Sequence, residues 1–334
     1  MRLMFIGRYQ YGAVLNIGFL SKTEINIDRL CNALAPRRLT VCRSKKELYT
    51  HIEAFDVLIV QNQGFKRGTV DAEILGRAEK LQMIQHHGVA TDITDIKAAA
   101  SRDILVATIP SQNSRSVAEH GMHLILALAR RSSLVRRLVV EGKMGEVECV
   151  ELQGKTLCIV GLGTIGKMIA EAAKGFGMHL IGVRKKMAKL PSNLSELKAF
   201  SALDLHVALA LADFSILVLP LNDETENIID RDAFAAMKRG AFLINISRGA
   251  HVDRSACEAA LDSGQLAGYA ADAMWEEPID PNDPILTDER VFLTPHIGGK
   301  SAEAIERITD AIRTNIRRFE LGEPLLNVVN SDAF

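Results

Sequence analysis

The sequence predicts an α/β fold made of two doubly wound parallel sheets in succession. Three observations support this fold class: short apolar runs alternate with helical patterns, the runs fall into two series, and a glycine-rich turn lies in the second series. Such alternation is typical of parallel sheets with helices on both faces. At ~100–200 residues per domain, a chain of 334 residues has room for two domains.

The first series of apolar runs predicts strands in the first third of the chain, over residues 2–6, 57–61, 81–86 and 104–107. The stretch 114–131 follows, with apolar residues at three- and four-residue spacing, and predicts the longest uninterrupted helix. We therefore expect the boundary between the two sheet systems near residue 112.

The second series predicts six strands, over residues 156–160, 179–183, 214–219, 241–246, 268–271 and 291–293. Most of the stretches between them are long enough for crossover helices. A last amphipathic helix is predicted over residues 301–322, because its pattern ends at Gly322, shortly before Pro324.

The composition excludes several classes of function. Forty basic and 41 acidic side chains give a net charge of −1, which provides no overall attraction to nucleic acid or to an anionic membrane. Five cysteines without Cys-x-x-Cys spacing are typical of thiols in a reducing compartment, not of disulfides or a zinc site. No apolar segment approaches the ~20 residues that span a bilayer, and the first apolar run is too short for a signal peptide. We expect a soluble, cytoplasmic protein.

Gly161, Gly163 and Gly166 form a G-x-G-x-x-G motif between an apolar strand and a helical pattern. In that context the motif is typical of a dinucleotide site in a Rossmann-like domain. The first glycine makes the tight turn, the second lets a pyrophosphate approach the backbone, and the third allows close helix–strand packing. The N–H groups that open the helix, at Thr164 and Ile165, are expected to face the phosphates. A purely structural glycine turn is the alternative.

Three cations, Arg184, Lys185 and Lys186, follow the next predicted strand, with Arg184 twenty-one positions after Gly163. An acidic residue at this place would bind the ribose hydroxyls and repel a 2′-phosphate, whereas arginine pairs with a phosphate through two parallel hydrogen bonds. The sequence therefore favours NADP as the cofactor. NAD is the alternative, with the three cations as a solvated surface.

Three residues capable of catalysis follow strands of the second series. Arg248 follows the run 241–246, Glu277 comes after 268–271, and His296 comes after 291–293. Because catalytic groups in open α/β sheets gather at the carboxyl ends of strands, we expect these three at the edge that carries the glycine turn. Taken singly, each residue has a structural interpretation: Arg248 in a loop ion pair, Glu277 as a surface acid and His296 as a capping residue. Together they predict a catalytic site.

These motifs resemble those of the D-isomer-specific 2-hydroxyacid dehydrogenases. The resemblance covers nearly the whole chain and is most specific between residues 152 and 300, where LQGKTLCIVGLGTIGK, LINISRGAHVD, GQLAGYAADAMWEEP and TPHIGG follow in family order. It implies hydride transfer between NAD(P)H and a small 2-oxo acid such as glyoxylate or hydroxypyruvate. It also implies a substrate-binding domain of residues 1–111 and 301–334, a dinucleotide-binding domain of residues 112–300, and an active-site cleft between them.

The resemblance further implies roles for single residues. His296 is expected to protonate the substrate carbonyl, with Glu277 as the carboxylate that favours the protonated imidazole. Arg248 is expected to bind the substrate carboxylate and polarise the carbonyl. The other implied contacts are Val89, Ala90, Gln61 and Trp275 for the substrate, and Pro220, Thr225 and Asp272 for the cofactor. Core packing is the alternative for Trp275, and capping of loop backbone is the alternative for Gln61.

Other functions share this pattern. Transcriptional co-repressors that sense a dinucleotide resemble the family, and so do phosphite dehydrogenases; formate dehydrogenases typically carry glutamine where Glu277 stands, which argues against that activity. The helix 114–131 resembles the family's dimerisation segment, so we expect a homodimer. His120 and His123 lie three residues apart on this helix, but no carboxylate or cysteine cluster accompanies them, and we expect no metal.

Overall fold

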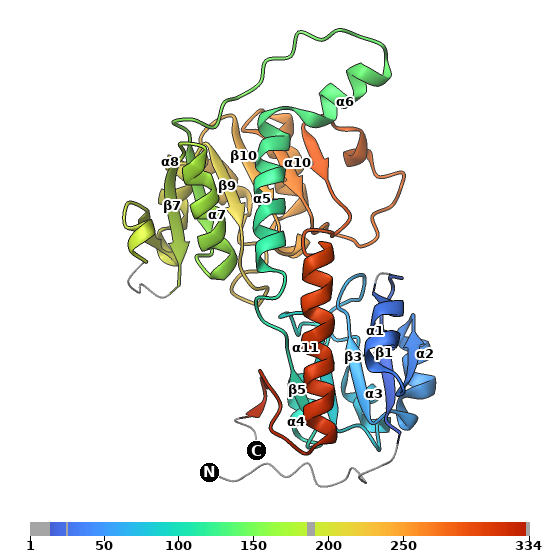
Figure 1. Ribbon diagram of the computed structural model, residues 1–334. Coiled ribbons are helices and arrows are strands. Elements are labelled where there is room, and N and C mark those ends of the chain that lie inside the picture. The colour runs from blue at the N-terminus through green and yellow to red at the C-terminus, as the bar shows by residue number, and fades with distance from the viewer. Residues whose placement is uncertain (1–13, 25, 186–190, 332–334) are drawn as a thin grey trace. The chain divides into compact units, whose positions relative to one another are not determined.

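The computed structural model describes residues 14–24, 26–185 and 191–331. The chain divides into two compact units, one of residues 1–113 with 300–334 and the other of residues 114–299. Within the described residues each unit has one all-parallel sheet, with five strands in the first unit and seven in the second (Figure 1). The predicted α/β fold class is confirmed.

The sheet of the first unit has the strand order β2-β1-β3-β4-β5. Its strands are β1 (Asn16–Leu20), β2 (Arg38–Cys42), β3 (Val57–Val60), β4 (Met83–His86) and β5 (Leu105–Ala107). Its α-helices are α1 (Ile27–Leu34), α2 (Lys45–His51), α3 (Ala72–Arg77), α4 (Ile96–Ala100) and α11 (Ala302–Glu320). The predicted strands 57–61, 81–86 and 104–107 correspond to β3, β4 and β5, and the prediction at 2–6 lies outside the described residues.

Strands β1 and β2 occupy places where the sequence predicts none. Gly18 interrupts the apolar run of β1, and glycine is required there because a Cβ would lie 2.4 Å from the ring of Phe55. Strand β2 is at the edge of the sheet, where its residues are mostly half-buried. An edge strand needs no continuous apolar run, so its sequence carries little signal.

Both faces of this sheet are covered, which explains the unbroken apolar sequence of β3. Val57 and Ile59 join a core cluster that includes Ile312 of α11, whereas Leu58 and Val60 join a cluster on the other face. Because side chains alternate along a strand, a strand covered on both faces is apolar throughout. The last helix, α11, is thus an integral part of the first unit (Figure 1).

The sheet of the second unit has the strand order β12-β11-β10-β9-β6-β7-β8. Its strands are β6 (Thr156–Val160), β7 (His179–Arg184), β8 (Lys198–Ser201), β9 (Phe214–Leu217), β10 (Ala241–Asn245), β11 (Leu266–Ala271) and β12 (Val291–Leu293). Its α-helices are α5 (Ser114–Ala129), α6 (Ser132–Val140), α7 (Thr164–Gly175), α8 (Leu205–Leu211), α9 (Arg231–Ala236) and α10 (Arg254–Asp262). The six strands predicted for this half are all present, and the short edge strand β8 is additional.

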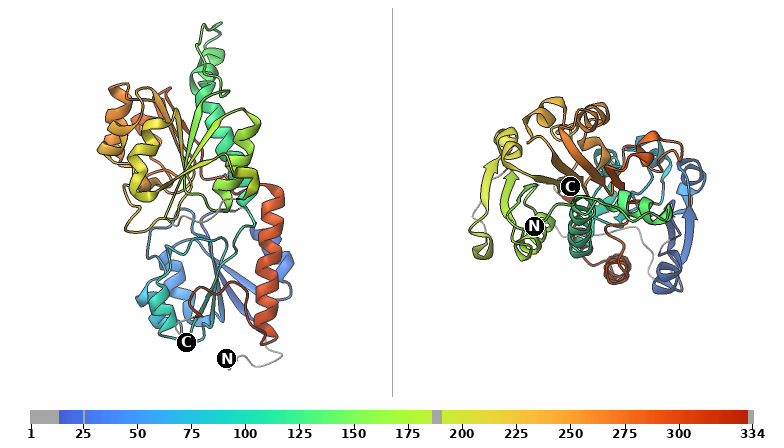
Figure 2. Two further views of the ribbon diagram at one scale, coloured as in Figure 1. Left: turned by 90° about the vertical axis from the view of Figure 1, so that its left-hand side faces the viewer. Right: turned by 90° about the horizontal axis from the view of Figure 1, so that it is seen from above.

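Helices lie on both faces of the second sheet (Figure 2). Helices α5 and α7 pack on one face, and α8, α9 and α10 pack on the other. The helix predicted over 114–131 ends at Ala129, because Arg131 adopts a left-handed conformation (φ 50°) from which α6 starts in a new direction. Every helix among the described residues is too short or too polar to span a membrane.

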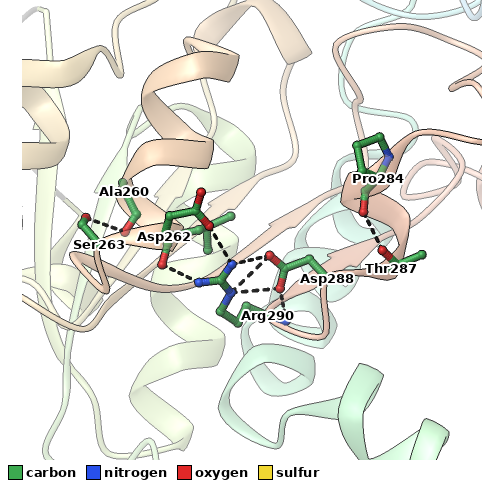
Figure 3. A network of polar contacts seen from close by, with 8 residues as sticks. Ala260, Asp262, Ser263, Pro284, Thr287, Asp288 and Arg290 are labelled. Carbon is green, nitrogen blue, oxygen red and sulfur yellow. Dashed lines mark hydrogen bonds and ion pairs between the residues drawn. The ribbon is translucent and has the colours of Figure 1, made fainter.

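The start of β12 is fixed by Arg290 (Figure 3). Its guanidinium donates to the Asp288 carboxylate at 2.6 Å and to the Leu261 carbonyl at 2.5 Å. The second bond ties β12 to the last turn of α10. This anchorage matters for the site because the turn after β12 carries His296.

Candidate functional site

The glycine turn follows β6 and leads directly into α7. Gly161 has a positive φ of 111°, and a Cβ there would lie 2.0 Å from the carbonyl oxygen of Val218. A Cβ on Gly166 would lie 2.1 Å from the Gly161 carbonyl oxygen. The N-cap of α7 is Gly163, which has no side chain to engage the first N–H groups of Thr164 and Ile165. This cradle of backbone N–H groups fits the pyrophosphate of a dinucleotide.

The predicted 2′-phosphate site lies at the end of β7. Arg184 is the last residue of the strand and is half-buried, and Lys185 is exposed. The Lys185 ammonium pairs with the carboxylate of Glu224 at 2.5 Å. Lys186 lies outside the described residues. This end of the sheet therefore carries cations, and Lys185 has Glu224 as its acidic partner.

Pro220 and Thr225, both predicted to contact the cofactor, lie in one turn beyond β9. The Thr225 hydroxyl donates to the Pro220 carbonyl at 2.8 Å. The same hydroxyl accepts from the backbone N–H of Asn222 at 2.9 Å. These bonds close the turn, which includes Glu224.

His296 and Glu277 are in direct contact. The His296 Nδ1 atom lies 2.9 Å and 3.0 Å from the two carboxylate oxygens of Glu277. Both side chains are partly buried, with 29% and 20% exposed, respectively. A carboxylate on Nδ1 orients the ring and directs Nε2 to proton transfer. His296 also has a positive φ of 54°, a sparsely populated conformation for a non-glycine residue that is common at functional sites.

Asp272 holds the turn on which His296 lies. Its carboxylate accepts from the Thr294 hydroxyl at 2.6 Å and from the backbone N–H groups of Ile297 and Gly298, both at 2.8 Å. Burial alone would raise the pKa of Asp272, but hydrogen bonds from His120, Thr294 and this backbone outweigh burial and lower it to about 2. Asp272 is therefore ionised and fully engaged in supporting the turn.

His120 of α5 completes this support, a part that the sequence analysis missed. Its Nε2 atom lies 2.9 Å from the Thr294 hydroxyl and 3.3 Å from the Asp272 carboxylate. The three residues are far apart in the chain, so spacing gives no signal of the contact. In the described part of the chain, no group of three histidine, cysteine or acidic side chains is arranged to hold a metal ion.

Arg248 lies in the turn after β10, at the N-cap of the short 3-10 helix η4 (Gly249–His251). The Asn245 side chain donates to the Arg248 carbonyl at 2.8 Å. The buried His251 ring contacts the backbone of Arg248. Its Nδ1 atom lies 3.2 Å from the Arg248 nitrogen and 3.0 Å from the Arg248 carbonyl oxygen. Burial lowers the pKa of His251, which favours the neutral ring. The backbone of Arg248 is thus fixed from two directions.

The Arg248 turn meets the turn that carries Glu277. A Cβ on Gly249 would lie 2.2 Å from the carbonyl oxygen of Met274, so only glycine fits between the two backbones. Trp275 joins the same two turns, because its indole N–H donates to the Val252 carbonyl at 2.8 Å. Its ring stacks on the buried Tyr269, with centroids 5.2 Å apart.

The candidates in the first unit lie at the carboxyl ends of β3 and β4. Gln61 is nearly buried, and its carbonyl oxygen accepts from the hydroxyls of Ser21 at 2.5 Å and Thr23 at 3.1 Å. Val89 is exposed. The Ala90 carbonyl accepts from the Asn62 side chain at 2.9 Å. Asn62, like Gln61 a candidate from the sequence, therefore fixes the segment in which Val89 and Ala90 lie.

Two histidines beside this segment are neutral near pH 7. His86 bridges Asn62 Oδ1 and the Thr94 hydroxyl, each at 3.1 Å. Burial lowers the pKa of His86 and of His87 to about 4. Gln61, Asn62, His86 and His87 are thus uncharged polar side chains, but an acidic side chain, Asp92, lies beside Asn62 and His86, and a basic one, Lys300, lies beside His87.

Comparison with known proteins gives one consistent result. Residues 122–298 match the family model described as D-isomer specific 2-hydroxyacid dehydrogenase, NAD binding domain. The chain is 36% identical to D-3-phosphoglycerate dehydrogenase of Methanocaldococcus jannaschii, across 86% of this chain and 54% of that protein. It is 33% identical to glyoxylate reductase of Korarchaeum cryptofilum, across 86% of this chain and 87% of that protein.

A protein of Thermus thermophilus has a similar solved structure, with a TM-score of 0.82 and 31% identity over 94% of this chain and 99% of that one. The chain spans about half the length of the phosphoglycerate dehydrogenases it matches, but most of the length of the glyoxylate reductase. These relatives therefore agree on the reaction family and differ in substrate.

Proposed function

This chain belongs to the D-isomer-specific 2-hydroxyacid dehydrogenase family, and from that premise we propose that it transfers a hydride between NADPH and a small 2-oxo acid. The observation that carries the proposal is the His296–Glu277 pair, at 2.9 Å, in the unit that also holds the glycine turn. The reaction interconverts a 2-oxo acid and a D-2-hydroxy acid, with glyoxylate or hydroxypyruvate as the favoured substrates.

In this proposal the side chains divide the work. A bound nicotinamide supplies the hydride. His296 donates a proton from Nε2 to the carbonyl oxygen, while Glu277 stabilises the ring on its Nδ1 side. Arg248 binds the substrate carboxylate and, with the backbone N–H groups of Val89 and Ala90, fixes the carbonyl for attack.

NADPH is proposed because Arg184 ends β7, the first strand after the glycine turn, and Lys185 directly follows it. A guanidinium and an ammonium both stabilise a 2′-phosphate, whereas the ribose hydroxyls of NADH call for an acidic partner. Glu224 works against this preference, because it already neutralises Lys185. NADH is thus the alternative cofactor.

A small substrate with one charged group is proposed because most side chains at the carboxyl ends of β3 and β4 are uncharged. Gln61, Asn62, His86 and His87 are neutral at pH 7, so a phosphorylated substrate would gain little from them, and Asp92 beside Asn62 would repel it. Lys300, beside His87, works against this preference. This feature supports glyoxylate or hydroxypyruvate over a phosphoglycerate-like substrate.

We also propose a homodimer formed through the α5–α6 region, in the cytoplasm. Every residue of α6 remains partly or fully exposed, including the apolar Val135, Val139 and Val140. An amphipathic helix with no fully buried residue in its own chain is well suited to a second copy. The five cysteines are free thiols, as expected in a reducing compartment.

The test is a comparison of initial rates with NADPH and NADH on glyoxylate, hydroxypyruvate, pyruvate, 3-phosphohydroxypyruvate and an aryl 2-oxo acid. We expect the fastest turnover with NADPH and one of the two small acids. Faster turnover with NADH would overturn the cofactor proposal, and a preference for the phosphorylated acid would overturn the substrate proposal. Tight cofactor binding without turnover would favour a dinucleotide sensor. A separate assay with phosphite and NADP+ or NAD+ tests the remaining alternative, and turnover there without reduction of any 2-oxo acid would favour phosphite oxidation.

A further inference from the structure

We propose that Trp275 is a positioning residue that ties the substrate-binding turn of Arg248 to the proton-donating turn of Glu277. This inference rests on the proposed roles of Arg248 and Glu277. It assigns Trp275 a task other than the contact with substrate that the sequence predicts.

The indole lies between the two turns and bonds across them. Trp275 is two residues before Glu277, and its N–H donates to the carbonyl of Val252 at 2.8 Å. Val252 is the C-cap of η4, whose N-cap is Arg248. One directional hydrogen bond therefore connects a rigid helical turn that starts at Arg248 with the turn that ends at Glu277.

The ring itself is held firmly. It stacks on Tyr269, which is fully buried in β11, with an interplanar angle of 29°. The Arg254 guanidinium lies 5.5 Å from the indole ring. Aromatic stacking and cation–π contacts both stabilise a fixed ring orientation. An indole fixed by these contacts is a suitable anchor for the hydrogen bond from its edge.

The backbones of the two turns touch, but this contact alone does not fix the position of one turn relative to the other. A Cβ on Gly249 would lie 2.2 Å from the Met274 carbonyl oxygen, so the surfaces are in close contact. Van der Waals contact resists compression but not sliding, whereas a hydrogen bond is directional. The indole N–H supplies the missing constraint.

From Trp275 the connection continues to the proton donor. The Met274 backbone N–H donates to Glu277 at 3.3 Å, and Glu277 contacts His296 at 2.9 Å. Arg248 and His296 must engage the carboxylate and the carbonyl of one small molecule at once. A displacement of about 1 Å between such groups lowers the rate about 100-fold.

The experiment compares Trp275→Phe, which keeps an aromatic ring and removes the N–H, with the native chain. The matched control is Phe234→Leu, a change in the buried core cluster against which Trp275 packs, but away from both turns. We expect Trp275→Phe to raise KM and lower kcat about tenfold each, for glyoxylate and hydroxypyruvate alike, because both carry the carboxylate that Arg248 binds. NADPH affinity, followed by nicotinamide fluorescence, stays within twofold, and the control keeps native KM and kcat.

Other results would overturn the proposal. Unchanged kinetics would show that the hydrogen bond positions nothing, and a KM that rises for hydroxypyruvate but not for glyoxylate would assign Trp275 to the wall of the substrate pocket. Calorimetric titration with oxalate tests the relative position of the two turns without turnover. If the native chain binds oxalate but reduces no 2-oxo acid, the proposed function is refuted, whereas the positioning role is not. Trp275→Phe should then weaken oxalate binding about tenfold; equal binding by both chains, or none by the native chain, would refute the positioning role.

Discussion

Two carboxylates shape the environment of His296, and they act on different parts of the residue. Glu277 contacts the ring at Nδ1, whereas Asp272 binds the backbone on the C-terminal side of His296, at Ile297 and Gly298. The first contact governs the chemistry of the imidazole, and the second holds a backbone that stays in the left-handed region at a cost of about 1–3 kcal/mol. Asp272 thus fixes the backbone beside His296, and Glu277 sets the orientation and the chemistry of its ring.

The role of His296 leads to the first prediction. His296→Asn removes the proton donor while keeping a polar side chain, so kcat for 2-oxo acid reduction should fall by about 10²–10⁴. Binding of NADPH, measured by nicotinamide fluorescence, should remain within a factor of two. The exposed His206→Asn is the control and should keep native kcat. Retained turnover in His296→Asn would refute the acid–base role.

Cofactor choice is also decided by single residues. Arg184→Asp replaces a cation with an anion at the end of β7, so the ratio of kcat/KM for NADPH over NADH should fall about tenfold to a hundredfold. Glu224→Gln removes the partner of Lys185 and should change the same ratio in the opposite direction, because the ammonium becomes available to a 2′-phosphate. Steady-state rates with both cofactors test both variants, and an unchanged ratio in Arg184→Asp would make the cations a solvated surface.

At the scale of elements, the sequence predicts strands that have an unbroken apolar run and misses strands, such as β1 and β2, whose run is interrupted by glycine or by polar residues. Strand β3 is covered on both faces and reads Val-Leu-Ile-Val, whereas the edge strand β2 reads Arg-Leu-Thr-Val-Cys because one side of it faces solvent. The end of α5 escapes prediction because Arg131 changes the chain direction without a glycine or proline. An apolar run indicates a buried strand, and this signal is lost where burial is partial, as in β2, or where a glycine interrupts the run, as in β1.

The site residues also divide into those that a sequence motif identifies and those that it does not. Gly161, Gly166 and the Glu277–His296 pair carry motifs, since their chemistry needs those residue types at fixed spacing. Asn62 and His120 carry no motif, because each acts through a partner brought close only by the fold. Thr294, the partner of His120, is 174 positions away in the chain. Supporting residues of this kind are found from contacts, not from spacing.

The buried His86 at the end of β4 gives a prediction on acid stability. Burial lowers its pKa to about 4, so the unfolded chain, with an ordinary histidine pKa near 6.5, takes up the proton first as the pH falls. The stabilisation is fully present above pH 6.5 and is lost as the pH falls toward 4. From pH 7 to pH 5 this one group should lower the free energy of unfolding by about 2 kcal/mol.

Urea unfolding followed by far-UV circular dichroism at pH 7 and pH 5 measures this loss. His86→Gln removes the titrating group and should shrink the pH-dependent difference by about 2 kcal/mol, whatever its effect on stability at pH 7. The exposed His51→Gln serves as the control and should leave the difference unchanged. An equal pH dependence in the native chain and His86→Gln would contradict the prediction.

At the scale of the whole molecule, the candidate residues of the two units differ in chemical type. The second unit holds the ionisable side chains of Arg248, Glu277 and His296, and the first unit holds the amides of Gln61 and Asn62. The sequence predicts both groups because each follows the carboxyl end of a parallel strand.

The proposed homodimer is tested at this scale through α6. Val139 is 66% exposed on a helix that remains exposed along its length, so a partner that covers it would gain apolar burial. Val139→Asp places a charge in that contact and should weaken the dimer at least about tenfold, because a buried carboxylate without a partner is costly. The matched control is Val207→Asp on α8, where a 55% exposed valine lies outside the α5–α6 region.

Sedimentation velocity over a range of concentrations should show a dimer for the native chain and the control, and a monomer at the lower concentrations for Val139→Asp. Native chain that sediments as a monomer at every concentration, or a Val139→Asp dimer as stable as the native one, would mean that α6 does not join two copies.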